Sequence, residues 1–216
     1  KFSKHGSPGA VKKGIFFTLH ADTLNLQVDN RPVLKITDVT GRSSLRYLTG
    51  GQLGFVIKGK IGTGDVTGIV KLPLEGDIQI THAEINEIPY LKQFDMDIKG
   101  SISSNITIHG DTAKVVFNVP DLDIDDSGSV IPLLNTFTSL QGALSLKADT
   151  TKVDSISLNG DKGYARLKGH ITGNVMELSL ELMPYAGKLS DMESMLISRY
   201  IVSPGYYVVP IKGPLP

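Results

Sequence analysis

The chain of 216 residues is predicted to be mainly β, forming an antiparallel, strongly curved or rolled sheet. We expect an elongated half-barrel or sandwich with one C-terminal helix near residues 190–201. Apolar and polar residues alternate with a period of two through most of the chain, which is typical of strands. Segments rich in Asn, Asp and Gly separate the alternating runs, as in β-hairpins. The fragment Gly-x-Ile-x-x-Asn-(Ile/Val) lies between two such runs at 100–106 and at 169–175, and a looser copy occupies 59–66.

The N-terminal half is dominated by predicted strands. The alternation predicts two or three strands over 14–39, with a turn at 29–32, and a short helical turn over 42–48. Alternating segments then follow one another with Gly-rich or Pro-containing breaks between them. These segments are 55–61, 66–72, 78–80, 85–88, 94–102, 106–108 and 115–119.

The C-terminal half is predicted to contain a second block of strands and the helix. An acidic loop over 121–135, with a short helix or irregular apolar segment at 133–134, leads into strands over 144–148, 156–158, 165–171 and 176–182. The run 159–163, Asn-Gly-Asp-Lys-Gly, predicts a tight turn. Ser190 and Glu193 have the spacing of a capping box, which predicts a helix start.

The sequence also predicts one apolar face for this helix and a strand after it. Leu189, Met192, Leu196 and Tyr200 fall on one helical stripe. The segment 206–211 predicts a final strand, and its Pro210, together with Pro214, cannot donate to a ladder. This strand is therefore expected at a sheet edge.

The predicted domain organisation is one elongated β-rich unit. Residues 1–13 are expected to form a flexible tail, whose four lysines favour a solvated segment over a membrane-surface contact. Residues 14–216 are expected to form a single domain, with possible lobes over 14–120 and 136–216 joined by the acidic loop 121–135.

The number of strands exceeds what the predicted helix can cover. Roughly ten or more strands each offer one apolar face, whereas only one helix is well signalled. The apolar face must therefore close on another sheet, roll into a half-barrel, or be lined by a lipid. The stripes at 94–98 and 176–182 raise the same question, and packed core is favoured there over acyl-chain lining.

Composition excludes several classes of function. With 22 basic and 22 acidic side chains, no electrostatic footprint for nucleic acid exists. The absence of cysteine excludes disulfides, thiolate nucleophiles and Cys-ligated zinc. No apolar run approaches the roughly 18 residues of a membrane span. Because the chain begins at Lys1 without an initiator Met, we expect that an anchor or signal segment preceded it.

Motifs that would indicate chemistry are incomplete. The stretch 54–61 resembles a P-loop, but Ile61 replaces the Mg²⁺-binding hydroxyl and the segment alternates like a strand. Asp121, Asp123 and Asp125 have the spacing that begins a calcium loop, but Asp126 and Pro132 replace its Gly and Glu, which favours a strand end over a weak ion site. No nucleophile–base pair is identifiable. The histidines lack the ligand spacing of one helix; they are His5, His20, His82, His109 and His170. We therefore expect no enzyme activity, no catalytic residue, no cofactor and no metal.

Three segments carry a resemblance to a known family. They are 51–74, the succession from Asp77 through Pro89 to Ile108, and the close from 158 to 215, which contains Gly205-Tyr206-Tyr207-Val208-Val209-Pro210-Ile211-Lys212-Gly213-Pro214-Leu215. Over most of residues 14–215 the chain resembles the periplasmic part of type II secretion system protein N (GspN), in the larger form seen with AsmA-like proteins. The Gly-Tyr-x-x-Pro-(Ile/Leu)-x-Gly-x-Leu pattern is similar to the family's end.

The resemblance implies a non-enzymatic periplasmic component or accessory of the type II secretion system. Such a protein would act in assembly through contacts with other secretion-system envelope proteins, at exposed sheet edges and loops. It would be held at the inner membrane of a Gram-negative bacterium by an anchor that this chain does not contain. The alternative is an AsmA-like module with an open apolar groove that binds or transfers lipid. The third hypothesis is an enzyme, for which the sequence shows no set of catalytic residues.

Overall fold

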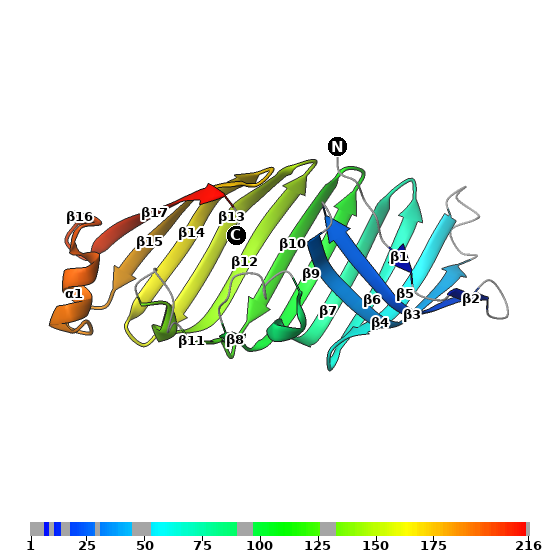
Figure 1. Ribbon diagram of the computed structural model, residues 1–216, viewed down its shortest axis with the longest axis horizontal. Coiled ribbons are helices and arrows are strands. Elements are labelled where there is room, and N and C mark those ends of the chain that lie inside the picture. The colour runs from blue at the N-terminus through cyan, green and yellow to red at the C-terminus, as the bar shows by residue number, and fades with distance from the viewer. Residues whose placement is uncertain are drawn as a thin grey trace.

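The computed structural model describes residues 7–8, 11–13, 18–28, 31–44, 53–89, 97–125 and 133–214. In these ranges, 15 strands form one antiparallel sheet that runs from an edge at β1 and β2 to an edge at β16 without closing. One α-helix lies near the C-terminal end of the chain. Figure 1 shows the sheet as an elongated, twisted layer, with α1 at the opposite end from β1 and β2. The predicted fold class, a mainly antiparallel β-protein with one C-terminal helix, is confirmed.

The strands of the large sheet are β1 (Ser7–Pro8), β2 (Val11–Lys13), β3 (Thr18–Val28), β4 (Arg31–Ser44), β5 (Leu53–Ile61), β6 (Gly64–Leu72), β7 (Glu75–Glu84), β9 (Ser101–His109), β10 (Thr112–Val119), β12 (Phe137–Lys147), β13 (Thr150–Gly160), β14 (Gly163–Thr172), β15 (Val175–Pro184), β16 (Ile201–Ser203) and β17 (Tyr206–Pro214). A separate two-stranded sheet pairs β8 (Asp97–Lys99) with β11 (Asp123–Asp125). The helices are α1 (Asp191–Ser198) and the short 3-10 helices η2 (Ile85–Glu87) and η4 (Leu134–Thr136).

Neighbouring strands of the large sheet are mostly neighbours in the chain. Tight turns such as Gly62-Thr63 and Asp161-Lys162 join many of them, as the hairpin signals predict. The segment that contains β11 and η4 is a larger excursion, yet β10 still pairs with β12 along eight residue pairs, from Thr112↔Lys147 to Val119↔Leu140. The large sheet therefore passes without a break from the N-terminal half of the chain to the C-terminal half.

The sheet curls at its N-terminal end. Strand β4 pairs with β5 only from Thr37 to Ser44, with a register shift near Asp38, whose φ is 50°. The first half of β4 and its partner β3 thus leave the plane, and Figure 1 shows them crossing over neighbouring strands. Ile36 of β4 packs there into a buried cluster. The other members of that cluster are Ile61, Val66, Ile80 and Ala83.

Glycines permit this close packing. A Cβ on Gly59 would lie 2.6 Å from Cγ2 of Ile36, and a Cβ on Gly64 would overlap the backbone of Ala83. Both glycines are buried. At these two positions, hydrogen is the largest side chain that the packing leaves room for.

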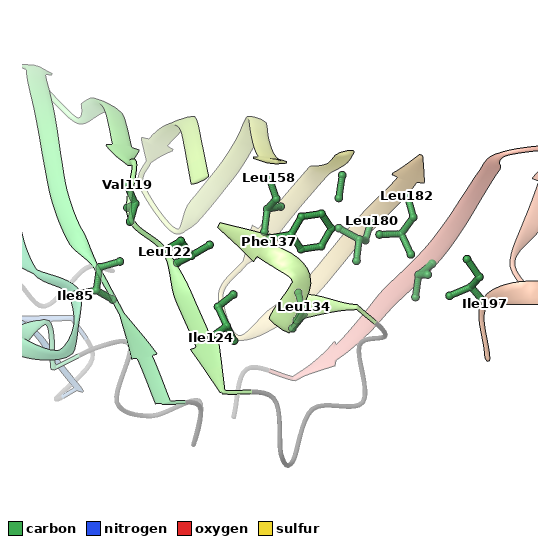
Figure 2. Close-up of a cluster of buried hydrophobic side chains, with 12 residues drawn as sticks. Ile85, Val119, Leu122, Ile124, Leu134, Phe137, Leu158, Leu180, Leu182 and Ile197 are labelled. Carbon is green, nitrogen blue, oxygen red and sulfur yellow. The ribbon is translucent and has the colours of Figure 1, made fainter. Parts of the chain in front are cut away.

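A second, larger core lies under the small sheet. Strands β8 and β11 lie along the lower side of the large sheet in Figure 1, and η4 lies beside them. Figure 2 shows Leu134 and Phe137 directed toward the face that carries Leu158 and Leu180, with Leu122 and Ile124 beside them. The cluster's remaining buried members are Ile85, Val119, Ala165, Leu182, Ile197 and Val209.

Helix α1 begins as the capping box predicts. The backbone N–H of Glu193 donates to the Ser190 hydroxyl, and the Ser190 backbone N–H donates to the Glu193 carboxylate. However, the predicted helical stripe is divided: Leu189 and Tyr200 pack against the core, but its two members within the helix do not. Met192 is 75% exposed and Leu196 is 56% exposed, whereas Ile197 is buried. The helix lies at the end of the sheet, and within it Ile197 is the residue that packs into the core.

Two local expectations of strand and turn are wrong. The fragment at 100–106 is not a hairpin turn, because Ser101–His109 is one continuous strand in which Asn105 sits exposed on the sheet surface. The run expected as one strand over 94–102 is interrupted at Gly100, whose φ is 142°, so that β8 and β9 belong to different sheets. Residues 94–96 lie outside the described ranges. The copy at 169–175 does contain a hairpin turn, at Gly173-Asn174.

Other expectations differ in detail. Residues 42–44, expected as helical, are the end of β4, and 45–48 lie outside the described ranges. The acidic loop 121–135 contains strand β11 and helix η4, of which the second agrees with the apolar segment predicted at 133–134. Strand β17 lies near the edge, as its prolines predict, with only the short β16 beyond it. Of the turn predicted at 29–32, residues 31–32 belong to β4, which begins at Arg31, and 29–30 lie outside the described ranges.

Candidate functional site

The antiparallel register brings apolar residues together in rows that run across the sheet. One row passes from β6 to β17 through residues paired with one another strand by strand, none of them charged. Its members are Val70, Gly76, Ile108, Ala113, Leu146, Thr151, Ile171, Met176 and Gly213. The adjacent row on the same face contains Gly68, Ile78, Ile106, Val115, Leu144, Val153, Gly169, Leu178 and Ile211.

Only part of this apolar face is covered. Toward the β8–β11 sheet, another row holds Val119, Leu158, Ala165 and Leu182, which are all buried in the larger core. The rows farther from that sheet remain accessible. We define the open strip as those of their apolar members that are neither buried themselves nor packed against a buried cluster: Val70, Ile108, Ala113, Val115, Leu144, Leu146, Ile171, Met176 and Leu178.

The dimensions of the open strip suit a chain-like apolar ligand. It extends from β6 to β15 through eight neighbouring strands, which corresponds to roughly 35 Å at about 4.8 Å per strand. The hydrocarbon core of a bilayer, which holds two acyl chains end to end, is about 30 Å thick. The strip is therefore longer than a single acyl chain.

Stripes predicted from the sequence divide between core and strip. Leu180 and Leu182 are buried, as the packed-core interpretation of 176–182 predicts, but Met176 and Leu178 of the same stripe are partly accessible. Ile98 packs against the larger core, while Phe94 and Met96 lie outside the described ranges. Alternation alone does not separate the two groups, because all four residues of 176–182 point to the same face.

The opposite face of the sheet is polar. Neighbouring strands carry paired charges there: Lys168 Nζ lies 3.0 Å from Glu181 Oε1, and Arg166 lies 3.9 Å from the same carboxylate. The hydroxyl of Ser145 donates to Asp154, which lowers the pKa of that carboxyl, and Lys152 lowers it further. Salt bridges at such exposed sites add little stability, so this face is a solvated surface.

A hollow of about 480 Å³ opens on the polar face between β7 and β13. Uncharged side chains line it, including the carboxamides of Gln79, Asn105, Asn118 and Gln141, and none of the lining residues is titratable. The hollow therefore offers no group that could act as a general acid or base.

Titratable residues on the described strands are dispersed. His170 lies 3.5 Å from Glu177, and the hydroxyls of Ser157 and Tyr164 lie 2.8 Å apart, a hydrogen bond that lowers the pKa of Tyr164. Asp121 accepts a hydrogen bond from the backbone N–H of Ser101 at 2.9 Å. In the described part of the chain, no three His, Asp or Glu side chains lie close enough to hold a metal ion. The P-loop-like stretch 54–61 is part of strand β5, as its alternation predicts.

At the end of the sheet, a pair of charges anchors helix α1. Lys162 Nζ lies 2.5 Å from Glu193 Oε1, and Ser190 also donates to this carboxylate. These bonds lower the pKa of Glu193 to about 2. The helix is thereby tied to the turn between β13 and β14.

Comparison with protein-family models, curated proteins and solved structures finds no match. The resemblance to type II secretion system protein N therefore stays a prediction. Across the residues that the structure describes, no helix is long and apolar enough to cross a membrane.

Proposed function

We propose that this protein is a non-enzymatic lipid-binding module whose open strip holds acyl chains. The observation that supports this proposal is the uncharged, largely apolar face that runs across neighbouring strands of the sheet and is only partly covered by protein. Contiguous apolar surface of this extent is rare on monomeric soluble proteins and usually marks a binding surface. An acyl chain would remove that surface from water and needs no hydrogen-bond partner.

The shape of the strip favours chains over compact ligands. It is a row of Val, Ile, Leu and Met side chains along the sheet, and the residues that cover the neighbouring rows form one wall beside it. A compact cofactor would need convergent polar groups to fix its orientation. The strip has none, because the two rows from which it is drawn hold only Gly, Ala, Thr and larger apolar residues.

The first test is direct. The 216-residue chain, purified gently from the envelope of a Gram-negative host, is expected to carry adducts with the masses of phospholipids or fatty acids in native mass spectrometry. It is also expected to bind a fluorescent fatty acid after those adducts are removed. A protein that is lipid-free and also fails to bind the fluorescent fatty acid would refute the proposal.

A second candidate is the role that the sequence resemblance implies, a periplasmic component or accessory of the type II secretion system. What favours a protein occupant is that β8 and β11 already cover part of the apolar face as a separate pair of strands. A segment of another envelope protein could cover the open strip in the same way. In this candidate the protein acts at the inner membrane, as the resemblance implies.

The two candidates give different results in one experiment. Pull-downs from an envelope extract are expected to recover a secretion-system component if the partner is a protein, and added fatty acid would then compete with it. Recovery of lipid without any secretion-system component would support the lipid-binding proposal and contradict the protein-partner candidate.

A further inference from the structure

The C-terminal end of the molecule carries an exposed apolar surface that is separate from the open strip. We define the apolar tip as Tyr185, the helix residues Met192, Met195 and Leu196, and Ile201 and Val202 of β16. These side chains are between 50% and 78% exposed. Figure 1 shows α1 and β16 together at one end of the long axis of the sheet.

The spacing of the helix residues explains the exposure. Met192, Met195 and Leu196 lie three and four positions apart, so they share one face of α1. Ile197 points the other way and is buried, and Leu189 and Tyr200, which flank the helix, pack against the larger core. The capping box and the bond from Lys162 to Glu193 hold this orientation. The exposed face is thus fixed by the fold and is not a consequence of fraying.

The outward side of β17 offers few donors for strand addition. The Val208 N–H donates to the Tyr200 carbonyl at 2.9 Å, on the side of β17 that faces away from β15. Because amide directions alternate along a strand, Pro210, Lys212 and Pro214 present their nitrogens to the same side. Both prolines lack a donor, which leaves Lys212 with the one outward N–H of this stretch. Strand β17 therefore offers few backbone donors to a partner, and the exposed side chains of the tip are the larger feature of this end.

The composition of the tip matches an interfacial membrane contact. Flexible Met and branched aliphatic side chains form its centre, and Tyr185 and Tyr200 flank them, as aromatic residues do at membrane interfaces. Lys188 is exposed beside Tyr185, and the Arg199 guanidinium lies 4.7 Å above the ring of Tyr200. Cations at this position would meet anionic headgroups.

Strands β15 and β17 link the tip to the proposed lipid site. Tyr185 follows the C-terminal end of β15 and Ile201 of β16 pairs with Tyr207, which lies opposite Leu182, whereas Met176 and Leu178 of the open strip lie toward the other end of β15. We propose that the apolar tip inserts into the surface of a phospholipid bilayer and so holds the end of the sheet that carries β15 at the membrane. This rests on the proposed function, because it assigns the source of the acyl chains.

Vesicle flotation tests the tip. The 216-residue chain is expected to float with vesicles of phosphatidylethanolamine and phosphatidylglycerol, and the triple variant M192S/M195S/L196S is expected to lose on the order of tenfold in bound fraction. As a matched control, Val116→Ser with Val175→Ser removes exposed apolar side chains from the polar face, at 45% and 53% exposure, and should float like the parent. Circular dichroism confirms that each variant is folded.

The outcomes separate the tip from the strip. Binding of a fluorescent fatty acid in solution should change by less than about twofold in the triple variant, because no residue of the strip is altered. If the triple variant floats like the parent, or if the parent binds fatty acid but does not float, the tip proposal is wrong and the lipid-binding proposal stands. If the parent is a dimer that the triple substitution makes monomeric, the tip is an interface between two copies, which overturns the bilayer proposal. If the parent floats but does not bind fatty acid, the proposal that the open strip holds acyl chains is wrong and the tip proposal stands.

Discussion

Val115 and Val116 offer a matched test of which face binds lipid. They are adjacent residues of the same type in β10, and the register places Val115 opposite Leu144 in the open strip and Val116 on the polar face. Val115 is partly accessible and Val116 is 45% exposed, so neither substitution empties a core. We expect Val115→Asp to abolish most fatty-acid binding and Val116→Asp to leave it unchanged.

The magnitude follows from what the aspartate does to a bound chain. The lost contact between the valine and an acyl chain amounts to about 1 kcal/mol, at roughly 25 cal/mol per Å² over about 40 Å². Covering a carboxylate with hydrocarbon adds about 1–3 kcal/mol or moves the chain away. The total is at least about 2 kcal/mol, which corresponds to roughly 30-fold weaker binding.

The assay is a fluorescence titration of the lipid-free protein with a fatty acid probe, at a pH where the aspartate is ionised. Urea denaturation of both variants serves as the control, and we expect their free energies of unfolding to lie within about 1 kcal/mol of each other. Equal loss of binding in both variants, or loss only in Val116→Asp, would show that the open strip is not where the chain binds.

Three further predictions concern the scaffold. The pKa of Glu193, lowered from 4.5 to about 2 by its lysine partner and Ser190, means that its contribution is complete above about pH 4.5 and is lost as the pH falls toward 2; because the pair lies at the surface we expect about 1 kcal/mol or less, seen as a smaller acid-induced drop in melting temperature in Glu193→Gln. Gly64→Ala places a methyl group against the backbone of Ala83 and should destabilise the protein by about 1–3 kcal/mol in urea, whereas Gly41→Ala, with open space around it, should not. Pro210→Thr restores an outward N–H on β17 and should increase concentration-dependent association in analytical ultracentrifugation; unchanged sedimentation would contradict the assigned direction of that amide.

Sequence reasoning predicted strands and most tight turns, because both depend on residues close together in the chain. The turns Gly62-Thr63 and Asp161-Lys162 lie within the segments whose composition predicts them, 62–65 and 159–163, although Asn159 and Gly160 belong to the end of β13. The fragment at 100–106 failed for a physical reason: Asn105 is compatible with the solvent face of a strand, and the chain turns instead at Gly110, whose φ is 58°. Composition favours a turn at such positions but does not require one.

For helix α1, the sequence predicted where the helix starts but not which of its faces is exposed. Its start followed from the local bonds between Ser190 and Glu193, which any sequence with this spacing can form. Its orientation did not, because Met192 and Leu196 are apolar enough for a core position and nothing nearby in the sequence shows that the sheet ends there. The exposed tip was therefore missed, although apolar residues are frequent between 192 and 202.

The sequence by itself determined that this protein makes many strands with one apolar face each, and that one helix cannot cover them. That much follows from local periodicity. The tertiary structure decided how much of the face stays open, since Leu182 is buried while Met176 of the same strand is accessible. Leu182 lies in a buried cluster with Leu122, Ile124 and Leu134, which come from segments about 48 or more residues away in the chain, and local pattern carries no information about which such segments pack together.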